Sequence, residues 1–205
     1  MVAPPPDPFT PQTEVLEAGT RIYRVHGNRF RTDEFNPGAG DATRFAFFGS
    51  PPVPVLYGAS REDVAVCESI LHEMPQKGGR LIPSRYRNRV MGRLEVTRDL
   101  KLASFWGTGL KALQVEAEEL TGSKPTTYGQ TVLWAEAAHR AGFDGCIWNS
   151  RLCNSGPAYV LFGDRAADAV QIDPGFARVF DTEEGLDWLQ RFCAPLHVEV
   201  IVRSR

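Results

Sequence analysis

Strand and helix patterns follow one another along this chain in an irregular order, and that order limits the folds open to it. Alternating or continuous apolar runs predict strands at residues 20–25, 53–57, 85–96, 145–148, 158–162, 170–172 and 198–202. Apolar residues at helical spacing predict helices at residues 60–73, 110–120, 131–141 and 182–192. The regular βαβ period of a doubly wound sheet is missing. The sequence therefore predicts an α+β fold, with short mixed sheets and flanking helices.

Length and composition indicate one folded domain. A chain of 205 residues with 42% hydrophobic and 23% charged residues can bury a substantial core. Residues 1–13 are rich in proline and predict an extended N-terminal arm, which leaves residues 14–205 as the domain itself. Residues 27–49 hold several glycines and aromatic residues, a composition typical of a long loop around a pocket.

Charge and hydropathy narrow the range of partners. A formal net charge of −2 argues against a general nucleic-acid binder, and no apolar run reaches the roughly 18–20 residues that span a bilayer. The N-terminus has neither a basic region nor an apolar leader, so we expect a cytoplasmic protein with no direct nucleic-acid or membrane partner. No metal-ligand spacing is present, and no metal is expected. The cysteines, predicted to be buried free thiols, are Cys67, Cys146, Cys153 and Cys193.

Glu68 is the most informative single residue, because it lies on the apolar stripe of the helix predicted at residues 60–73. Ser60 suits the N-cap, with Asp63 three residues on, as in a capping box. A carboxylate on an apolar face must find hydrogen bonds or accept a raised pKa, and either outcome suits a residue that handles a substrate. A core-edge glutamate paired with an arginine is the alternative. The helical neighbours of Glu68 are Val64, Ala65, Leu71 and His72.

Three arginines alternate at the start of the strand predicted at residues 85–96. Arg85, Arg87 and Arg89 would then share one face of that strand. Such a row is usually a solvated face, and the alternative is a binding surface for phosphate or an acidic partner.

Taken in order, a set of short motifs resembles the RES-domain family, which takes its name from an Arg, a Glu and a Ser. The motifs that carry this resemblance are Tyr23-Arg24, Thr43-Arg44-Phe45, Leu56-Tyr57-Gly58-Ala59, Ala65-Val66-Cys67-Glu68 and Ser150-Arg151. They extend from about residue 20 to residue 165. Thr43 and Phe45 stand where glycine and tryptophan are common in the family.

The resemblance implies a fold similar to that of the ADP-ribosyltransferases and an enzyme that consumes NAD. It implies a toxin of a type II toxin–antitoxin system, which cleaves the nicotinamide–ribose bond by phosphorolysis or hydrolysis and thus acts as an NAD phosphorylase or glycohydrolase. Its partners would be NAD, phosphate as one acceptor, and a cognate antitoxin protein with a helix-turn-helix domain. NAD is then a substrate, and no cofactor is expected. The alternatives are an ADP-ribosyltransferase with a protein acceptor and a non-catalytic binding module.

The chemistry of the matched residues agrees with that implication. Arg24 and Arg44 could grip a pyrophosphate bidentately, and Tyr57 could stack on nicotinamide or bond a ribose hydroxyl. Glu68 could stabilise the oxocarbenium-like charge that forms as the glycosidic bond breaks. Ser150 is assigned to substrate positioning, because no adjacent base makes it a nucleophile. The structural alternatives are an ion-pair role for either arginine, a core-edge role for Tyr57 and an ordinary strand-end serine at residue 150.

Overall fold

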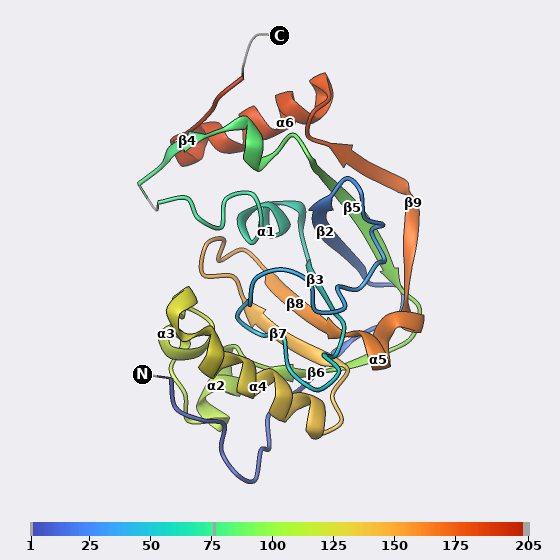
Figure 1. Ribbon diagram of the computed structural model, residues 1–205, viewed down its shortest axis with the longest axis vertical. Helices are drawn as coiled ribbons and strands as arrows, with labels where there is room; N and C mark the ends of the chain where they lie inside the picture. The colour runs from blue at the N-terminus through green and yellow to red at the C-terminus, as the bar shows by residue number, and fades with distance from the viewer. Residues whose placement is uncertain (1, 76, 203–205) are drawn as a thin grey trace.

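A large curled sheet with helices around it forms the body of the protein (Figure 1). The computed structural model describes residues 2–75 and 77–202. An eight-stranded sheet runs in the order β1-β6-β7-β8-β3-β2-β5-β9, and β10 and β4 make a separate pair. The strands are β1 (Thr13–Leu16), β2 (Arg21–Gly27), β3 (Val55–Ala59), β4 (Gly79–Leu81), β5 (Arg89–Val96), β6 (Leu100–Ser104), β7 (Gly145–Asn149), β8 (Pro157–Phe162), β9 (Val170–Val179) and β10 (Val198–Val200).

The sheet is mixed. β6 pairs with β7 in parallel, whereas the other pairs within the large sheet are antiparallel. β3 enters the sheet between β2 and β8, so strands that are distant in sequence lie side by side at its centre. The α+β class and the flanking helices predicted from the sequence are therefore confirmed.

Within the described residues, six α-helices cover the sheet and its ends. α4 lies against β7, α1 packs over β2 and β3, and α6 packs against β10. The helices are α1 (Glu62–Cys67), α2 (Gly107–Ala112), α3 (Ala117–Leu120), α4 (Tyr128–Arg140), α5 (Gly163–Ala166) and α6 (Glu183–Cys193). The helices predicted at residues 131–141 and 182–192 correspond to α4 and α6. Gly142 follows α4 with φ +90°, the left-handed conformation that glycine adopts most readily after a helix.

The hydrophobic core occupies both faces of the large sheet. One side contains most of the buried aromatic side chains, among them Phe45, which is fully buried with its ring centre 5.1 Å from that of Trp148. Smaller aliphatic side chains fill the other side, including Leu56 and Leu161. Burial on both faces explains why the central strands are continuous apolar runs rather than alternating ones.

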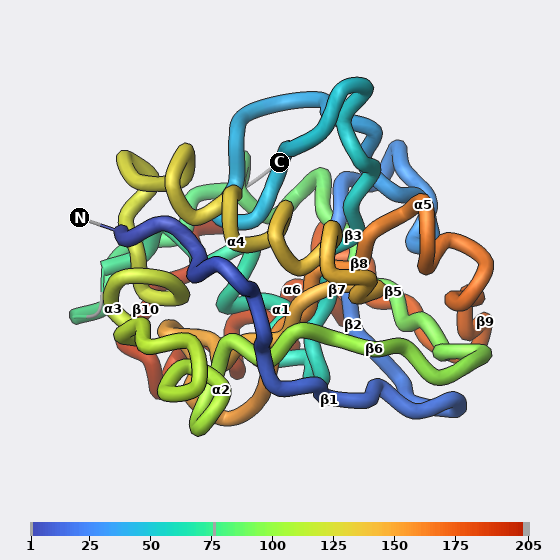
Figure 2. The backbone as a smooth tube through the Cα atoms, turned by 90° about the horizontal axis from the view of Figure 1, so that it is seen from below, coloured from blue at the N-terminus to red at the C-terminus, as the bar shows by residue number. Residues whose placement is uncertain are grey.

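The N-terminal segment has little regular structure and lies along α4 (Figure 2). Trp134 donates a 2.9 Å hydrogen bond from Nε1 to the carbonyl of Ala3, and the ring of Phe9 meets the same indole edge to face. Val2 is only 6% exposed. The segment predicted as an arm is therefore fastened to the domain from residue 2 onward, and Met1 lies outside the described residues.

The helix predicted at residues 60–73 is much shorter, and Ser60 does not cap it. α1 ends at Cys67, with Glu68 as its C-cap, and Arg61 in extended backbone precedes its first turn. Ser69 explains the early end: its hydroxyl donates to the carbonyl of Ala65 at 2.5 Å and so competes with continued helical bonding. Glu68 therefore stands at a helix end rather than in a helical stripe.

The arginine row predicted on a strand at residues 85–96 is also wrong. Pro83 opens a 3₁₀ helix (Pro83–Arg85), and β5 begins only at Arg89. The buried ring of Tyr86 anchors this turn, because its hydroxyl donates to the carbonyl of Ile201 at 2.9 Å. The three arginines consequently do not share a strand face.

The helix predicted at residues 110–120 is divided into α2 and α3. Between them Gln114 adopts φ +55°, a left-handed conformation that no helix can continue through. Val115 is then buried, 7% exposed, in the connecting turn. The apolar spacing of residues 110–120 therefore belongs to two short helices separated by a turn.

The four cysteines are free thiols, as predicted. Cys67, Cys146 and Cys193 are buried, and Cys153 is partly exposed. Within the residues that the structure describes, no helix combines the length and apolarity needed to cross a membrane.

Candidate active site

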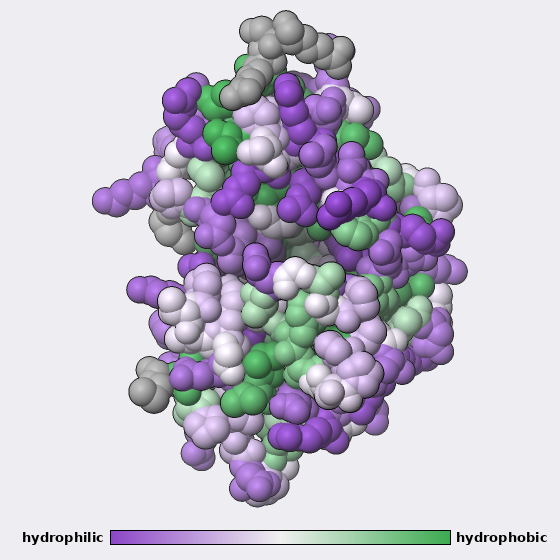
Figure 3. Space-filling model, viewed as in Figure 1, coloured by the Kyte–Doolittle hydropathy of each residue, from purple (hydrophilic) through white to green (hydrophobic). Residues whose placement is uncertain are grey.

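A cavity of about 760 Å³ opens between β2, β3, the end of α1 and the loop before β3. Its volume falls in the range of sites that hold a cofactor-sized ligand. The space-filling view shows hydrophilic side chains around the middle and upper part of this face, where the surface is hollowed (Figure 3). Its lining residues include Arg24, Arg44, Tyr57, Glu68, Arg89, Tyr128 and Trp148.

Glu68 lies on the cavity wall and is held there by Ser150. The Ser150 hydroxyl donates to Glu68 Oε1 at 2.6 Å, although the two residues are 82 positions apart in sequence. Ser150 follows β7 directly, and its hydroxyl oxygen accepts from the backbone N–H groups of Cys153 and Leu152 at 3.1 and 3.3 Å. The serine is fully buried, so no water competes for its hydroxyl proton, which it donates to Glu68. Ser150 does not line this cavity, and its hydroxyl contacts the carboxylate of Glu68 instead.

The position of Glu68 at a helix C-terminus makes that hydrogen bond important. The end of a helix carries partial negative charge, which does not favour a carboxylate. A short, charge-assisted bond from Ser150 offsets part of that cost. The carboxylate has thus found a hydrogen-bond partner, one of the two outcomes expected for it from the sequence.

Arg44 is a buried cation on the opposite part of the wall. It is 5% exposed and donates from Nε to Ser123 Oγ and from Nη2 to the Ser123 carbonyl, both at 3.3 Å. Its guanidinium also lies 5.6 Å from the ring centre of Tyr128. No carboxylate of the described residues forms an ion pair with it, which argues against a structural ion-pair role. A buried charge without a counterion is a place where an anionic ligand binds well.

Tyr57 presents its ring to the cavity while its hydroxyl is occupied elsewhere. The hydroxyl oxygen accepts from the backbone N–H of Phe45 at 3.1 Å and shares a 2.9 Å hydrogen bond with Thr43. Burial raises the pKa of Tyr57 well above its usual range. The ring of Trp148 stands edge to face with it at 6.0 Å. The ring of Tyr57 is therefore free to stack on a ligand. Its hydroxyl is already bonded to Thr43 and Phe45, the two residues that flank Arg44.

Thr43 and Phe45 keep this turn in place. Thr43 supplies the side-chain hydroxyl that bonds Tyr57, and Phe45 is fully buried against Trp148. The departures from the common family pattern at these two positions leave Arg44 on the cavity wall.

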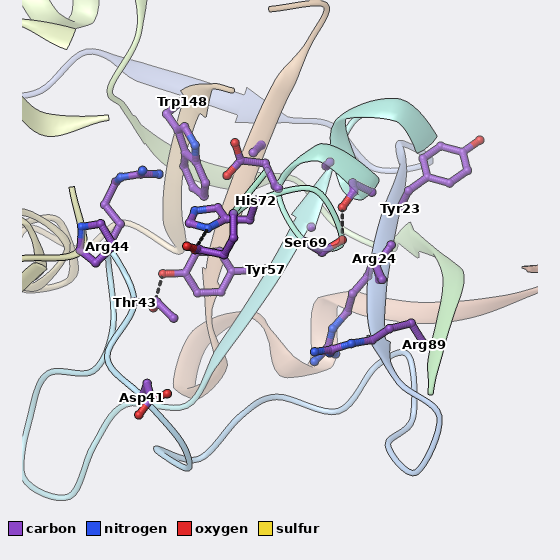
Figure 4. A pocket seen from close by; sticks show the side chains of 18 of the residues that line it. Tyr23, Arg24, Asp41, Thr43, Arg44, Tyr57, Ser69, His72, Arg89 and Trp148 are labelled. Carbon is purple, nitrogen blue, oxygen red and sulfur yellow. Dashed lines mark hydrogen bonds and ion pairs between the residues drawn. The ribbon is translucent and has the colours of Figure 1, made fainter. Parts of the chain in front are cut away.

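Arg24 fixes the long loop and faces the cavity at the same time. Its Nη1 donates to the carbonyls of Thr32 and Glu34 at 2.7 and 2.6 Å. Burial lowers the pKa of Arg24 to about 10, against the opposing charges of Glu34 and Asp33. Arg24 thus orders residues 32–34 through its Nη1 atom, and the side chain also lines the cavity (Figure 4).

Of the five residues that the sequence singled out, four line one cavity: Arg24, Arg44, Tyr57 and Glu68. The fifth, Ser150, is hydrogen-bonded to Glu68. Sequence reasoning missed Tyr128, Trp148 and, as a member of this site, Arg89. Trp148 lies in the run Gly145 to Ser150 that drew attention to the serine, and its burial on a cavity wall follows from β7 being central. Tyr128 gave no signal, because it only begins α4.

The chain belongs to the RES domain family: the family model matches residues 21–183, which includes every site residue discussed above. Among solved structures, the chain is similar to the crystal structure of the M. tuberculosis MbcT-MbcA toxin-antitoxin complex. The similarity has a TM-score of 0.55 and 17% sequence identity, and it covers 80% of this chain and 85% of that chain. At this identity the likeness concerns the fold alone. No curated protein matches the chain in sequence.

Proposed function

We propose that this protein degrades NAD by cleaving the bond between nicotinamide and ribose, and that it is the toxin of a type II toxin–antitoxin pair in the cytoplasm. The observation that carries the proposal is Glu68, hydrogen-bonded to Ser150 on the wall of a cavity that also holds guanidinium groups without an ion pair to any described carboxylate. Membership of the RES domain family and the fold shared with a toxin–antitoxin complex support it.

Glu68 is suited to the bond-breaking step. As the bond between ribose C1′ and the nicotinamide nitrogen breaks, its electron pair leaves with nicotinamide, which departs neutral, and positive charge develops on the ribose. A carboxylate fixed beside that carbon stabilises this charge more in the transition state than in the ground state. Because Ser150 restricts the carboxylate to one orientation, little reorganisation is needed as the charge forms.

The remaining walls match the other parts of the substrate. The ring of Tyr57, set against Trp148, offers an aromatic surface for the nicotinamide. Guanidinium groups suit the pyrophosphate, since they bind phosphate oxygens bidentately. The proposed reaction uses these groups alone, with NAD as a substrate and without a metal or prosthetic group.

The surroundings of Arg44 favour phosphate over water as the acceptor. Arg44 and Glu68 line the same cavity, and the Arg44 guanidinium lies 5.6 Å from the ring centre of Tyr128, which lines it too. A phosphate ion held by Arg44 would neutralise its charge and stand close to the carboxylate. One phosphate oxygen would then bond to C1′ as nicotinamide leaves, giving ADP-ribose 1-phosphate.

An antitoxin protein is the proposed partner. The solved structure with the similar fold is a toxin–antitoxin complex, and the RES family resemblance points to an antitoxin with a helix-turn-helix domain. Expression of this protein alone should arrest growth, and co-expression of the antitoxin should restore it. Growth arrest that persists with Glu68→Gln would separate toxicity from the proposed chemistry.

NAD consumption by the purified protein is the direct test. The wild type and Glu68→Gln are incubated with NAD, with and without phosphate, and the products are resolved by mass. Phosphate-dependent loss of NAD with release of nicotinamide, absent in the variant, supports the phosphorylase. Loss that is indifferent to phosphate supports the glycohydrolase. A protein that consumes NAD only when another protein is added is an ADP-ribosyltransferase, and one that never consumes it is a binding module.

A further inference from the structure

Two arginines line the cavity from neighbouring strands, and neither forms an ion pair with a carboxylate of the described residues. Arg24 lies on β2 and Arg89 begins β5, the strand that pairs with β2. Figure 4 shows their guanidinium groups converging at one side of the cavity. Both charges also lower the pKa of His26, although burial is the largest cause of that shift. Two cations therefore act on the same small region of the site.

The other arginines of this part of the sheet are paired, which makes these two distinctive. Arg87 has Asp181 at 3.4 Å, and Arg93 has Asp173 at 2.7 Å. Arg89 has no such ion pair within residues 2–75 and 77–202, and Arg24 contacts only backbone carbonyls. Like charges that converge repel one another unless an anion lies between them.

Arg44 serves a different part of the cavity. Its charge lowers the pKa of Tyr57 and Tyr128, whereas Arg24 and Arg89 act on His26. In the close view Tyr57 lies between Arg44 and the Arg24 and Arg89 ends (Figure 4). Arg44 and the pair formed by Arg24 and Arg89 thus lie at different parts of the cavity wall.

We infer that Arg24 and Arg89 together form a clamp for the pyrophosphate of a nucleoside diphosphate ligand, and that Arg89 is a substrate-binding residue. Arg24 is held rigidly by the carbonyls of Thr32 and Glu34, so half of the clamp is preorganised. Arg89 is exposed and can close on the second phosphate. A pyrophosphate carries two adjacent phosphates and thus matches two guanidinium groups better than a single phosphate does. This clamp rests on the proposed function and assigns Arg44 to a second anion.

Ligand binding tests the clamp without relying on turnover. Dissociation constants are measured calorimetrically for ADP-ribose, inorganic pyrophosphate and adenosine, with the wild type, Arg89→Gln and Arg87→Gln. The matched control is Arg87→Gln, which removes an equal charge two residues from Arg89. Arg87 is paired with Asp181 and does not line the cavity. Thermal melts check that each variant is folded.

Arg89→Gln is expected to weaken the binding of ADP-ribose and of pyrophosphate by about tenfold or more, as for loss of one charged hydrogen-bonding group. Adenosine, which has no phosphate, should bind the wild type and Arg89→Gln equally. Arg87→Gln should bind every ligand as the wild type does. Equal weakening by both variants, or wild-type affinity in a folded Arg89→Gln, overturns the clamp.

The clamp and the proposed function can fail separately. A wild type that binds pyrophosphate through Arg89 but never consumes NAD keeps the clamp and overturns the NAD-degrading function. A wild type that consumes NAD with an unchanged Michaelis constant in Arg89→Gln keeps the function and overturns the clamp.

Discussion

Ser150 donates a 2.6 Å hydrogen bond to Glu68 and joins the turn after β7 to the end of α1. The serine is fully buried, and two backbone N–H groups of its own turn fix its oxygen. This hydrogen bond fixes the direction of the Glu68 carboxylate, although Ser150 does not itself line the cavity. A glutamate and a serine of the family pattern thus act as one unit.

Glu68→Gln should remove NAD cleavage and leave the fold intact. The amide keeps the size of the side chain and loses the negative charge, so the rate should fall by at least about a hundredfold, as for other losses of preorganised electrostatic stabilisation. NAD loss and a thermal melt measure the two effects. Glu199→Gln, on an exposed side chain paired with Arg80, is the control and should keep wild-type activity. A full-rate Glu68→Gln enzyme would contradict the assignment.

Ser150→Ala should act on the rate rather than on substrate binding. The serine orients Glu68 without lining the cavity, so kcat should fall by about tenfold while KM for NAD changes little. Two N–H groups also lose their acceptor, and the free energy of unfolding should fall by about 1 kcal/mol. Steady-state kinetics and urea unfolding separate these effects. A raised KM at constant kcat would place Ser150 in direct contact with substrate instead.

Arg44→Met should reduce activity without loss of stability. The guanidinium is 5% exposed and has no carboxylate partner among the described side chains, so removing its charge relieves a desolvation cost. The loss of its contacts to Ser123 offsets part of this gain. We expect a free energy of unfolding within about 1 kcal/mol of the wild type and a clear loss of phosphate-stimulated NAD consumption. Strong destabilisation in urea would instead make Arg44 a structural residue.

Stability should fall in mild acid because of His26. Burial is the main cause that lowers the pKa of His26, and the charges of Arg24 and Arg89 lower it further. The hydrogen bond to the Gly27 carbonyl and the charge of Glu34 raise it in part. His26 is therefore protonated near pH 6.5 in the unfolded chain but only at lower pH in the folded protein. The free energy of unfolding falls as the pH drops below about 6.5. Urea unfolding at pH 7.5 and 5.5 measures the loss. In His26→Gln the loss should be smaller, and an equal loss would assign it to other groups.

Deletion of residues 2–9 should lower stability while the site chemistry persists. The segment buries Val2, places Phe9 on Trp134 and supplies the carbonyl of Ala3 to the indole N–H. Losing these contacts should cost about 1–3 kcal/mol of the free energy of unfolding, which urea denaturation measures. Phe9→Leu should have a smaller effect in the same direction. An unchanged unfolding midpoint in the deletion variant would mean that the observed contacts contribute nothing in solution.

Much of the secondary structure followed from local patterns. Two helices, α4 and α6, lie close to their predicted ranges; Gly142 follows α4, and the Thr182 hydroxyl accepts a hydrogen bond from the N–H of Gly185 at the start of α6. α1 was predicted too long, because the Ser69 hydroxyl that ends it competes only once the chain has folded. The turn after Pro83 and the left-handed Gln114 depend in the same way on tertiary burial of neighbouring side chains.

The site was predictable as a set of residues but not as a geometry. Ordered motifs singled out Arg24 and Glu68, and both line the cavity. The direction of Ser150 could not be predicted, since it depends on β8 pairing with β3 and on β7 pairing with the other edge of β8. The difference between Arg87 and Arg89 was equally hidden, because only the fold decides which arginine meets Asp181.

The strand order has a consequence for synthesis of the protein on the ribosome. β3 lies between β2 and β8, so the centre of the sheet cannot close until residues 157–162 have emerged. A nascent chain that stops before Ser150 also lacks the partner of Glu68. Translation products that stop before β8 therefore lack Ala158 and an assembled cavity, which can form only after most of the polypeptide has left the exit tunnel.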